Sequence, residues 1–245
     1  MERFFLKLAY NGKNYHGWQM QPKDISVQEI LEKALSTILR SPIEIVGAGR
    51  TDSGVHAREM FAHFDAENLP ETSELIKKLN SFLPTDIAVS DVISVHHDAH
   101  ARFDAVSRTY QYHIHQNKNP FLHDSSWFYP HNLDLEKMNQ AANILLEYVD
   151  FECFSKTNTD VNTFNCKIIH ARWQKTNDEI IFSITADRFL RNMVRAVVGT
   201  LIEVGIGKLE SENIRNIILS KNRSNAGFSV PAHGLYLTKI VYPYL

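Results

Sequence analysis

The sequence contains little cysteine, no long apolar run and no strong excess of charge of either sign. Its 245 residues include two cysteines, Cys153 and Cys166, which are too few for a disulfide framework. Neither lies in a CxxC pattern, so a thiolate metal site is not expected. Residues 1–18 are apolar only briefly, which predicts neither a signal peptide nor a membrane span, and the expected location is the cytoplasm.

The charge of the chain is nearly balanced. Lys and Arg number 26 against 28 Asp and Glu, which gives a formal net charge of −2 with histidine neutral. A nucleic-acid-binding domain is often strongly basic, so the bulk charge argues mildly against such a partner. The 12 histidines weaken that argument, because a fraction of them is protonated near neutral pH. The placement of the positive charges therefore matters more than their sum.

The first hundred or so residues follow the order strand, helix, strand, strand, helix, strand. Ser26 and Glu29 form a capping box before an apolar i, i+3, i+4 stripe, and Pro42 ends that helix. This order is typical of the split βαβ arrangement of ferredoxin-like domains. The expected elements are a strand at 4–10, a helix at 26–40, strands at 44–48 and 59–66, a helix at 75–82 and a strand at 87–95.

The second half repeats the order of elements with longer connections. Asp134 caps a predicted helix whose expected inner face is Met138, Ala142, Leu145 and Val149. The other expected elements are a strand at 108–115, a hairpin of 167–175 with 179–186, helices at 189–204 and 212–219, and a closing strand at 235–242. Together the halves predict an α+β fold. Two ferredoxin-like domains, 1–105 and 106–245, would form one mostly antiparallel sheet with helices on one face.

A glycine-rich loop separates the two middle strands of the first half. Three of the ten glycines, at 47, 49 and 54, fall within eight residues, so the backbone there adopts a special conformation or approaches a ligand closely. The reactive side chains of this loop are Arg50, Asp52 and His56. Composition alone fits an ordinary hairpin turn equally well. The loop is therefore a candidate site, with His56 expected in a structural hydrogen bond.

Arginines recur in the predicted helix at 189–204. With helical geometry, Arg188, Arg191 and Arg195 lie within about 60° of one another, opposite the apolar face. This spacing predicts an RNA-binding face, and its alternative is a solvated helix surface. The polar run 158–163 is either an RNA-contacting flap or a simple connection.

The histidines near the middle of the chain raise the question of a metal site. On a strand, His96, Asp98 and His100 would share one face. No further ligand is indicated elsewhere in the sequence, so no metal is predicted.

Four ordered segments resemble one known family. Residues 49–57 read GRTDSGVHA, which resembles the signature of the tRNA pseudouridine synthase A family. The other matching segments are HARF at 100–103 with RTYQY at 108–112, FLRNMVR at 189–195, and PAHGLYL at 231–237. The chain departs from the family pattern at Ser53, which is usually Ala, and at FSV in 228–230, which is usually Pro-Thr-Ala. Neither departure is expected to abolish activity.

The resemblance implies a cofactor-free and metal-free isomerase with two ferredoxin-like halves around a basic cleft. It implies that Asp52 is the catalytic carboxylate, that Tyr110 stacks on the target base and that Arg195 pairs with Asp52. The implied reaction converts uridine to pseudouridine at positions 38, 39 and 40 of the tRNA anticodon arm. A cytoplasmic homodimer with tRNA as partner, and without membrane or nucleotide cofactor, is expected.

Further arginines are expected to contact the RNA. Arg50 is placed to hold a phosphate or to fill the space that the flipped base leaves, and the other expected contacts are Arg58, Arg188 and Arg191. Asp52 would act either as a nucleophile at C1′ or as a base on a ribose proton, and both routes remain open.

Two alternative functions remain at this point. A non-catalytic RNA-binding protein would use its sheets as stacking platforms and would not need the Asp–Arg pair. A carboxylate-dependent hydrolase would need a second acid, for which Glu59 is the nearest candidate in sequence.

Overall fold

The computed structural model describes residues 1–157 and 161–245, so part of the polar run 158–163 lies outside the described residues. The chain forms two compact units. The first comprises Met1–Val106 together with Leu237–Leu245, and the second comprises Ser107–Tyr236. Among the described residues, no helix combines the length and the apolar character needed to cross a membrane.

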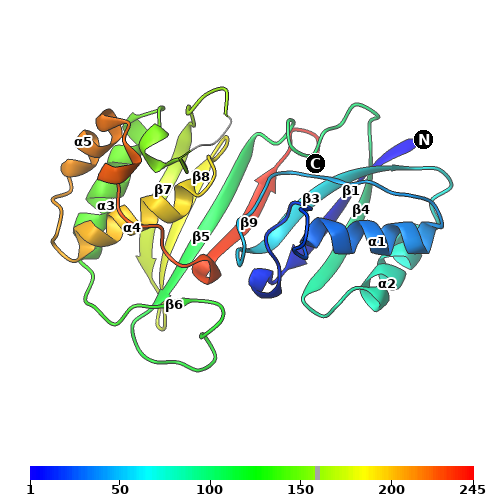
Figure 1. The fold of residues 1–245 in the computed structure, drawn as a ribbon, viewed down its shortest axis with the longest axis horizontal. Helices are drawn as coiled ribbons and strands as arrows, with labels where there is room; N and C mark the ends of the chain where they lie inside the picture. Colours follow the sequence, from blue (N-terminus) through cyan, green and yellow to red (C-terminus); the bar gives the residue numbers. More distant parts are fainter. Residues whose placement is uncertain (158–160) are drawn as a thin grey trace. The chain divides into compact units, whose positions relative to one another are not determined.

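The first unit contains an antiparallel sheet with two helices packed side by side on one face (Figure 1). Its strand order is β4-β1-β3-β9, and β2 pairs with β3. The strands are β1 (Glu2–Tyr10), β2 (Val46–Gly47), β3 (His56–Ala66), β4 (Ile87–Val95) and most of β9 (Leu235–Val241). The helices are α1 (Val27–Leu39) and α2 (Thr72–Phe82). The predicted strand at 44–48 is wrong in length, because only two of its residues pair.

The capping box and the apolar stripe explain α1. The Ser26 hydroxyl accepts a hydrogen bond from the Glu29 N–H at 3.2 Å, which confirms the predicted cap. Val27 and Leu31 on the inner face of the helix are fully buried. Leu6 and Leu8, alternate residues of β1, are also buried, and this strand supplies the opposing apolar surface.

The other face of the first sheet is covered by aromatic side chains and by the turn after β4. The Tyr242 ring lies edge-on to Phe5 at 5.1 Å, and its hydroxyl donates to the Ala101 carbonyl at 2.5 Å. The Ala101 N–H donates in turn to Nδ1 of His63 at 3.1 Å. Because β4 ends at Val95, residues 96–100 form a turn and not a strand. The suggestion that His96, Asp98 and His100 share a strand face is therefore wrong.

The stability of the first unit is expected to fall in mild acid because of His63. Burial, with a smaller contribution from the charge of Arg3, lowers the pKa of His63 to about 4. The unfolded chain takes up a proton below about pH 6.5 that the folded chain takes up only near pH 4. The folded state should therefore lose about 2 kcal/mol by pH ~5 relative to pH ~7.

Urea unfolding of the His63→Gln variant tests this expectation. The variant should lack most of that acid-induced loss, because it lacks the titrating ring. His97→Gln is the matched control, since the His97 side chain is 85% exposed and should leave the loss unchanged. An equal loss of unfolding free energy in all three proteins would contradict the role of His63.

The second unit combines a mostly antiparallel sheet with three helices among its described residues. The sheet order is β5-β8-β7, and β6 lies parallel beside β5. The strands are β5 (Ser107–His115), β6 (Trp127–Phe128), β7 (Ile168–Lys175) and β8 (Ile180–Ala186). The helices are α3 (Leu135–Ile144), α4 (Met193–Gly205) and α5 (Asn213–Ser220). The predicted α+β class with mostly antiparallel pairing is confirmed.

Two of the helix predictions for the second unit are wrong in extent. Asp134 caps α3 by accepting from the Lys137 N–H at 3.1 Å, as predicted, but the helix ends at Ile144 and Val149 is 57% exposed. Val149 is thus not part of the inner face. The helix predicted at 189–204 begins only at Met193, because Asn192 adopts a left-handed conformation with φ +66°.

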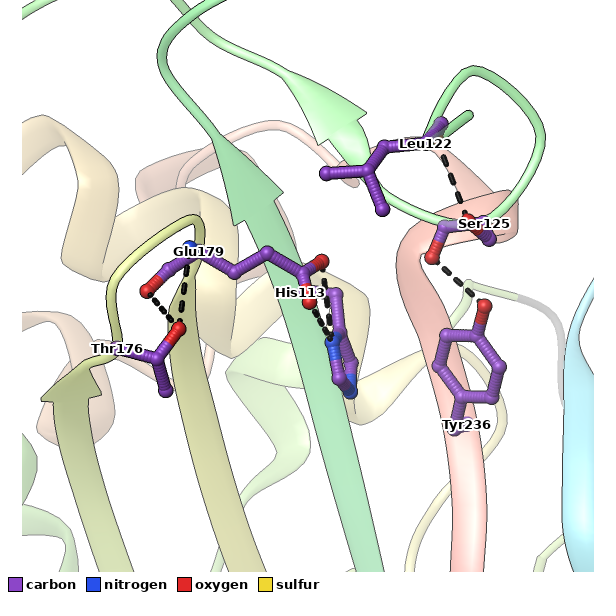
Figure 2. Close-up of polar contacts among 6 residues, drawn as sticks. All are labelled: His113, Leu122, Ser125, Thr176, Glu179 and Tyr236. Carbon is purple, nitrogen blue, oxygen red and sulfur yellow. Dashed lines mark hydrogen bonds and ion pairs between the residues drawn. The ribbon is translucent and has the colours of Figure 1, made fainter. Parts of the chain in front are cut away.

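Polar contacts fix one end of the second sheet and the loop that follows β5 (Figure 2). Figure 2 shows the Glu179 carboxylate turned toward the His113 ring, and both carboxylate oxygens lie 3.3 Å from Nδ1. The Thr176 hydroxyl donates to the Glu179 carbonyl at 2.9 Å and closes the β7–β8 turn. The Tyr236 hydroxyl donates to the Ser125 carbonyl at 2.7 Å, which ties the loop after β5 to the start of β9.

Candidate active site

The glycine-rich loop between β2 and β3 lies against the segment that follows β1. The Thr51 carbonyl accepts from the Trp18 N–H at 3.4 Å, and the Thr51 hydroxyl lies 2.9 Å from that of Tyr10. On the other side of Asp52, the Gly54 N–H donates to the Tyr15 carbonyl at 3.2 Å. The loop is therefore held on both sides of Asp52, at Thr51 and at Gly54, by the end of β1 and the segment that follows it.

This close approach depends on glycines. A Cβ atom at Gly12 would lie 2.0 Å from the Val55 carbonyl oxygen, and one at Gly17 would lie 2.3 Å from that of Thr51. Gly17 also has φ +90°, in the region that L side chains rarely adopt. The geometry of the site thus also depends on glycines about forty residues earlier in the chain.

Asp52 lies half-buried at the turn of the loop, and its carbonyl accepts from the Val55 N–H at 3.2 Å. His56 at the end of the loop is buried, and its Nδ1 accepts from the Gly12 N–H at 3.0 Å. A ring nitrogen that accepts this bond carries no proton, so His56 acts as a structural hydrogen-bond acceptor, as predicted. The loop can thus present a carboxylate on a fixed backbone.

The two arginines near Asp52 are exposed. Arg50 donates from Nε to Oε1 of Gln19 at 3.2 Å, which orients its guanidinium. Arg58 lies on β3 with an exposed side chain. Both positions suit contacts with an anionic partner, because an exposed guanidinium can be approached by a phosphate from solvent.

Tyr110 lies on β5 of the second unit, half-exposed, with its ring edge-on to that of Phe189 at 5.2 Å. Tyr112, the next residue on the same strand face, is fully buried and donates from its hydroxyl to the Pro231 carbonyl at 2.8 Å. The buried Tyr112 therefore fixes β5 two residues after Tyr110. The Phe189 contact fixes the ring plane of Tyr110 while part of its surface remains accessible.

Arg195 lies in the first turn of α4 and is held by the segment 228–230. Its Nε donates to the Val230 carbonyl at 2.7 Å, and the Val230 N–H donates to the Arg195 carbonyl at 3.3 Å. Because these bonds use the backbone of Val230, they do not require a particular side chain there. The departure of FSV from the usual Pro-Thr-Ala therefore preserves the support of Arg195.

Arg188 and Arg191 do not share a helix face with Arg195, so that part of the sequence prediction is wrong. Both residues precede α4, and the left-handed turn at Asn192 breaks the helical spacing. Arg188 is half-buried and donates from Nη1 to the Thr163 carbonyl at 3.4 Å, whereas Arg191 is exposed. Both lie in the loop that leads into α4.

The structure thus groups the predicted residues by unit. The first unit carries Arg50, Asp52 and Arg58, and the second carries Tyr110, Arg188, Arg191 and Arg195. The predicted pairing of Asp52 with Arg195 would join residues of different units, and it stays a prediction.

Sequence reasoning missed Arg102 and Gln19, which line a pocket with Arg50. Arg102 belongs to the HARF segment, so the signal for it was present.

Glu59 has contacts of its own on β3. Its Oε2 pairs with Nζ of Lys7 at 3.0 Å, and its Oε1 accepts from the Ile240 N–H at 2.8 Å. The second acid that a hydrolase would need is therefore engaged in joining β1, β3 and β9. This arrangement disfavours the hydrolase alternative.

Comparison with known proteins places most of the chain in one family. A family model described as tRNA pseudouridine synthase matches residues 8–104 and 141–243. The chain is 52% identical over 244 residues to a Parabacteroides distasonis protein named tRNA pseudouridine synthase A, covering 99% of this chain and 97% of the relative. Relatives of the same name from Porphyromonas gingivalis and Bacillus licheniformis are 53% and 39% identical, over 99% and 96% of this chain and 98% and 97% of the relatives. The chain belongs to the tRNA pseudouridine synthase family.

Proposed function

We propose that this protein converts uridine to pseudouridine at positions 38, 39 and 40 of the tRNA anticodon arm, with Asp52 as the catalytic carboxylate. The observation that carries the proposal is the GRTDSGVHA loop, in which hydrogen bonds between Thr51 and Tyr10 and Trp18, and between Gly54 and Tyr15, hold the chain on both sides of Asp52. The family match over residues 8–104 and 141–243 supports the same reaction.

The reaction is an isomerisation in which no atom is gained from a co-reactant. The C1′–N1 bond breaks, the uracil rotates, C5 bonds to C1′, the C5 proton leaves and N1 gains a proton. Asp52 either forms a transient ester with C1′ or removes a ribose proton to give a glycal. Both routes need an ionised carboxylate on a fixed loop, which is the arrangement that the first unit supplies.

Two residues of the second unit complete the proposed site. Tyr110 stacks on the flipped uracil, with its hydroxyl near the C5 proton that must leave. Arg195 pairs with the Asp52 carboxylate, and the 2.7 Å bond from its Nε to the Val230 carbonyl orients its guanidinium for this task. The two ferredoxin-like halves would then enclose the central cleft, with Leu237–Leu245 belonging to the first half and not to the second as the sequence predicts.

The proposed RNA contacts are phosphate contacts from Arg50, Arg58, Arg188 and Arg191. The enzyme is proposed to act as a cytoplasmic homodimer, so that two subunits present a joint surface to one tRNA. Because the net charge is only −2, the affinity should come from these local arginines and should fall with salt.

The test is release of tritium from a tRNA transcript labelled at uridine C5. The unaltered protein should release one tritium for each pseudouridine formed. A transcript with cytidine at position 38, 39 or 40 should release less tritium, by the amount that uridine at that position contributes. Binding without release would favour a non-catalytic RNA-binding protein. Free uracil as the product would favour a hydrolase, because the C1′–N1 bond would then break without rejoining.

A further inference from the structure

A small pocket lies beside the catalytic loop in the first unit. Its volume is about 110 Å³, well below the roughly 300 Å³ of a pocket for a drug-sized molecule, so it suits a small group and not a whole nucleoside. The pocket is formed where the residues just before Asp52 approach Trp18 and the start of α1. It is lined by Trp18, Gln19, Gln28, Ile45, Val46, Gly47, Gly49, Arg50 and Arg102.

The polar groups of this pocket favour an anion. Two of the lining side chains are guanidinium groups, those of Arg50 and Arg102, and none of the lining residues, all within the described part of the chain, carries a carboxylate. An adjoining hollow of about 690 Å³ differs, because three of its lining residues are acidic, namely Glu29, Glu32 and Glu44. Charge therefore separates the two hollows, and an anion would be attracted to the smaller one.

Hydrogen bonds hold the guanidinium of Arg50 and the backbone of Arg102. Gln19 accepts from Arg50 Nε at 3.2 Å, which leaves the Nη groups of Arg50 directed to other acceptors. Gln19 in turn donates from Nε2 to Oε1 of Gln28 at 3.1 Å. The backbone of Arg102 is fixed by the turn after β4, because its N–H donates to Nδ1 of His100 at 3.1 Å.

The wall of the pocket contains two glycines, Gly47 and Gly49, and a Cβ atom would meet different surroundings at each. A Cβ atom at Gly47 would lie 2.4 Å from the Trp18 ring, so internal packing explains that glycine. A Cβ atom at Gly49 would meet no atom within 4 Å, and Gly49 does not have a positive φ. Neither packing nor backbone conformation therefore requires glycine at position 49. The open space in front of it is available to a bound group.

We propose that this pocket binds one backbone phosphate of the substrate RNA, with Arg50 and Arg102 as its donors and Gly49 keeping its wall open. The proposal rests on the proposed function, since it assumes RNA at the Asp52 loop, and it adds Arg102 and Gly49 to the binding residues. Guanidinium groups match a phosphodiester because each offers two parallel N–H donors to two oxygens. Arg50 lies two residues before Asp52 in the loop. A phosphate bound there therefore fixes the RNA strand close to the catalytic carboxylate.

The experiment measures binding of an anticodon-arm RNA by fluorescence anisotropy at several salt concentrations. Arg102→Ala should weaken binding about tenfold and should reduce the slope of log Kd against log salt by about 0.7–0.9, the value for one lost phosphate contact. Lys77→Ala is the charge-matched control, because Lys77 is exposed on α2 and should leave the slope unchanged. An unchanged slope for Arg102→Ala would overturn the proposal.

The glycines supply a second, independent pair of variants. Gly49→Ala should keep the melting temperature of the unaltered protein and weaken RNA binding several-fold. Gly47→Ala should lower the melting temperature, because its methyl group meets Trp18. If Gly49→Ala binds RNA as tightly as the unaltered protein, the pocket is not the phosphate site.

A neutral methylphosphonate placed in turn at each phosphate near the target uridine identifies the bound group. At one position it should weaken binding to the unaltered protein, and it should weaken binding to Arg102→Ala less, because only Arg50 then remains to contact that phosphate. Competition by inorganic phosphate alone, with no such position in the RNA, would assign the pocket to a free anion and overturn the proposal. Failure of the unaltered protein to form pseudouridine would instead reject the proposed function and leave the anion site standing.

Discussion

Asp52→Asn is expected to lower the turnover number for pseudouridine formation by about 10³-fold or more while leaving the Kd for tRNA within about twofold. The amide has almost the same size as the carboxylate, and the loop is held through Thr51 and Gly54, so the fold should persist. The amide can neither attack C1′ nor remove a ribose proton at a useful rate. Binding should remain, because phosphate contacts supply most of the affinity for RNA.

Single-turnover tritium release, anisotropy binding and thermal unfolding measure the three quantities separately. Ser53→Ala is the matched control, because it changes the neighbouring residue to the one usual in the family and loses only a 3.4 Å contact with the Tyr15 carbonyl. It should turn over like the unaltered protein. If Asp52→Asn loses RNA binding and thermal stability together with turnover, Asp52 holds the structure of the loop and is not the catalytic group.

Most of the elements could be predicted from the sequence because local patterns determine them. The N-caps predicted at Ser26 and Asp134 both form, and the strand predicted at 87–95 matches β4 in full. The prediction failed where a single backbone conformation overrode periodicity. Asn192 has a side chain that tolerates φ +66°, so the helix expected from residue 189 starts at Met193 although the residues before it have helical spacing.

The residues of the candidate site could be predicted from the sequence, but the contacts that hold its loop in place could not. The GRTDSGVHA segment indicates Asp52 directly, since its match to the family signature is long and ordered. Gly12 and Gly17 carry no such signal, because their role depends on contacts with Val55 and Thr51 that only the folded chain creates. The nearly neutral net charge was similarly uninformative. What matters is that the pocket at Arg50 is basic while the adjoining hollow is acidic.

Replacement of Gly17 by alanine is expected to damage both stability and turnover. The new methyl group would lie 2.3 Å from the Thr51 carbonyl oxygen, and alanine would also have to adopt φ +90°. Strain and overpacking together should lower the free energy of unfolding by about 2–4 kcal/mol. Because Thr51 precedes Asp52, the shift that relieves the clash displaces the carboxylate, and a displacement near ~1 Å costs up to about 10²-fold in rate.

The contribution of the clash can be separated from that of backbone strain by a second glycine. Gly207 has φ +76°, but a Cβ atom there would meet nothing within 4 Å, so Gly207→Ala suffers strain alone. It should lose about 1 kcal/mol in urea unfolding and keep its turnover number. For Gly17→Ala, the loss should fall on the turnover number more than on KM, because only Arg50 among the proposed RNA-binding arginines adjoins Thr51 in the chain. Equal unfolding losses for the two variants, with full turnover in both, would show that the loop does not depend on its contact with Gly17 to position Asp52.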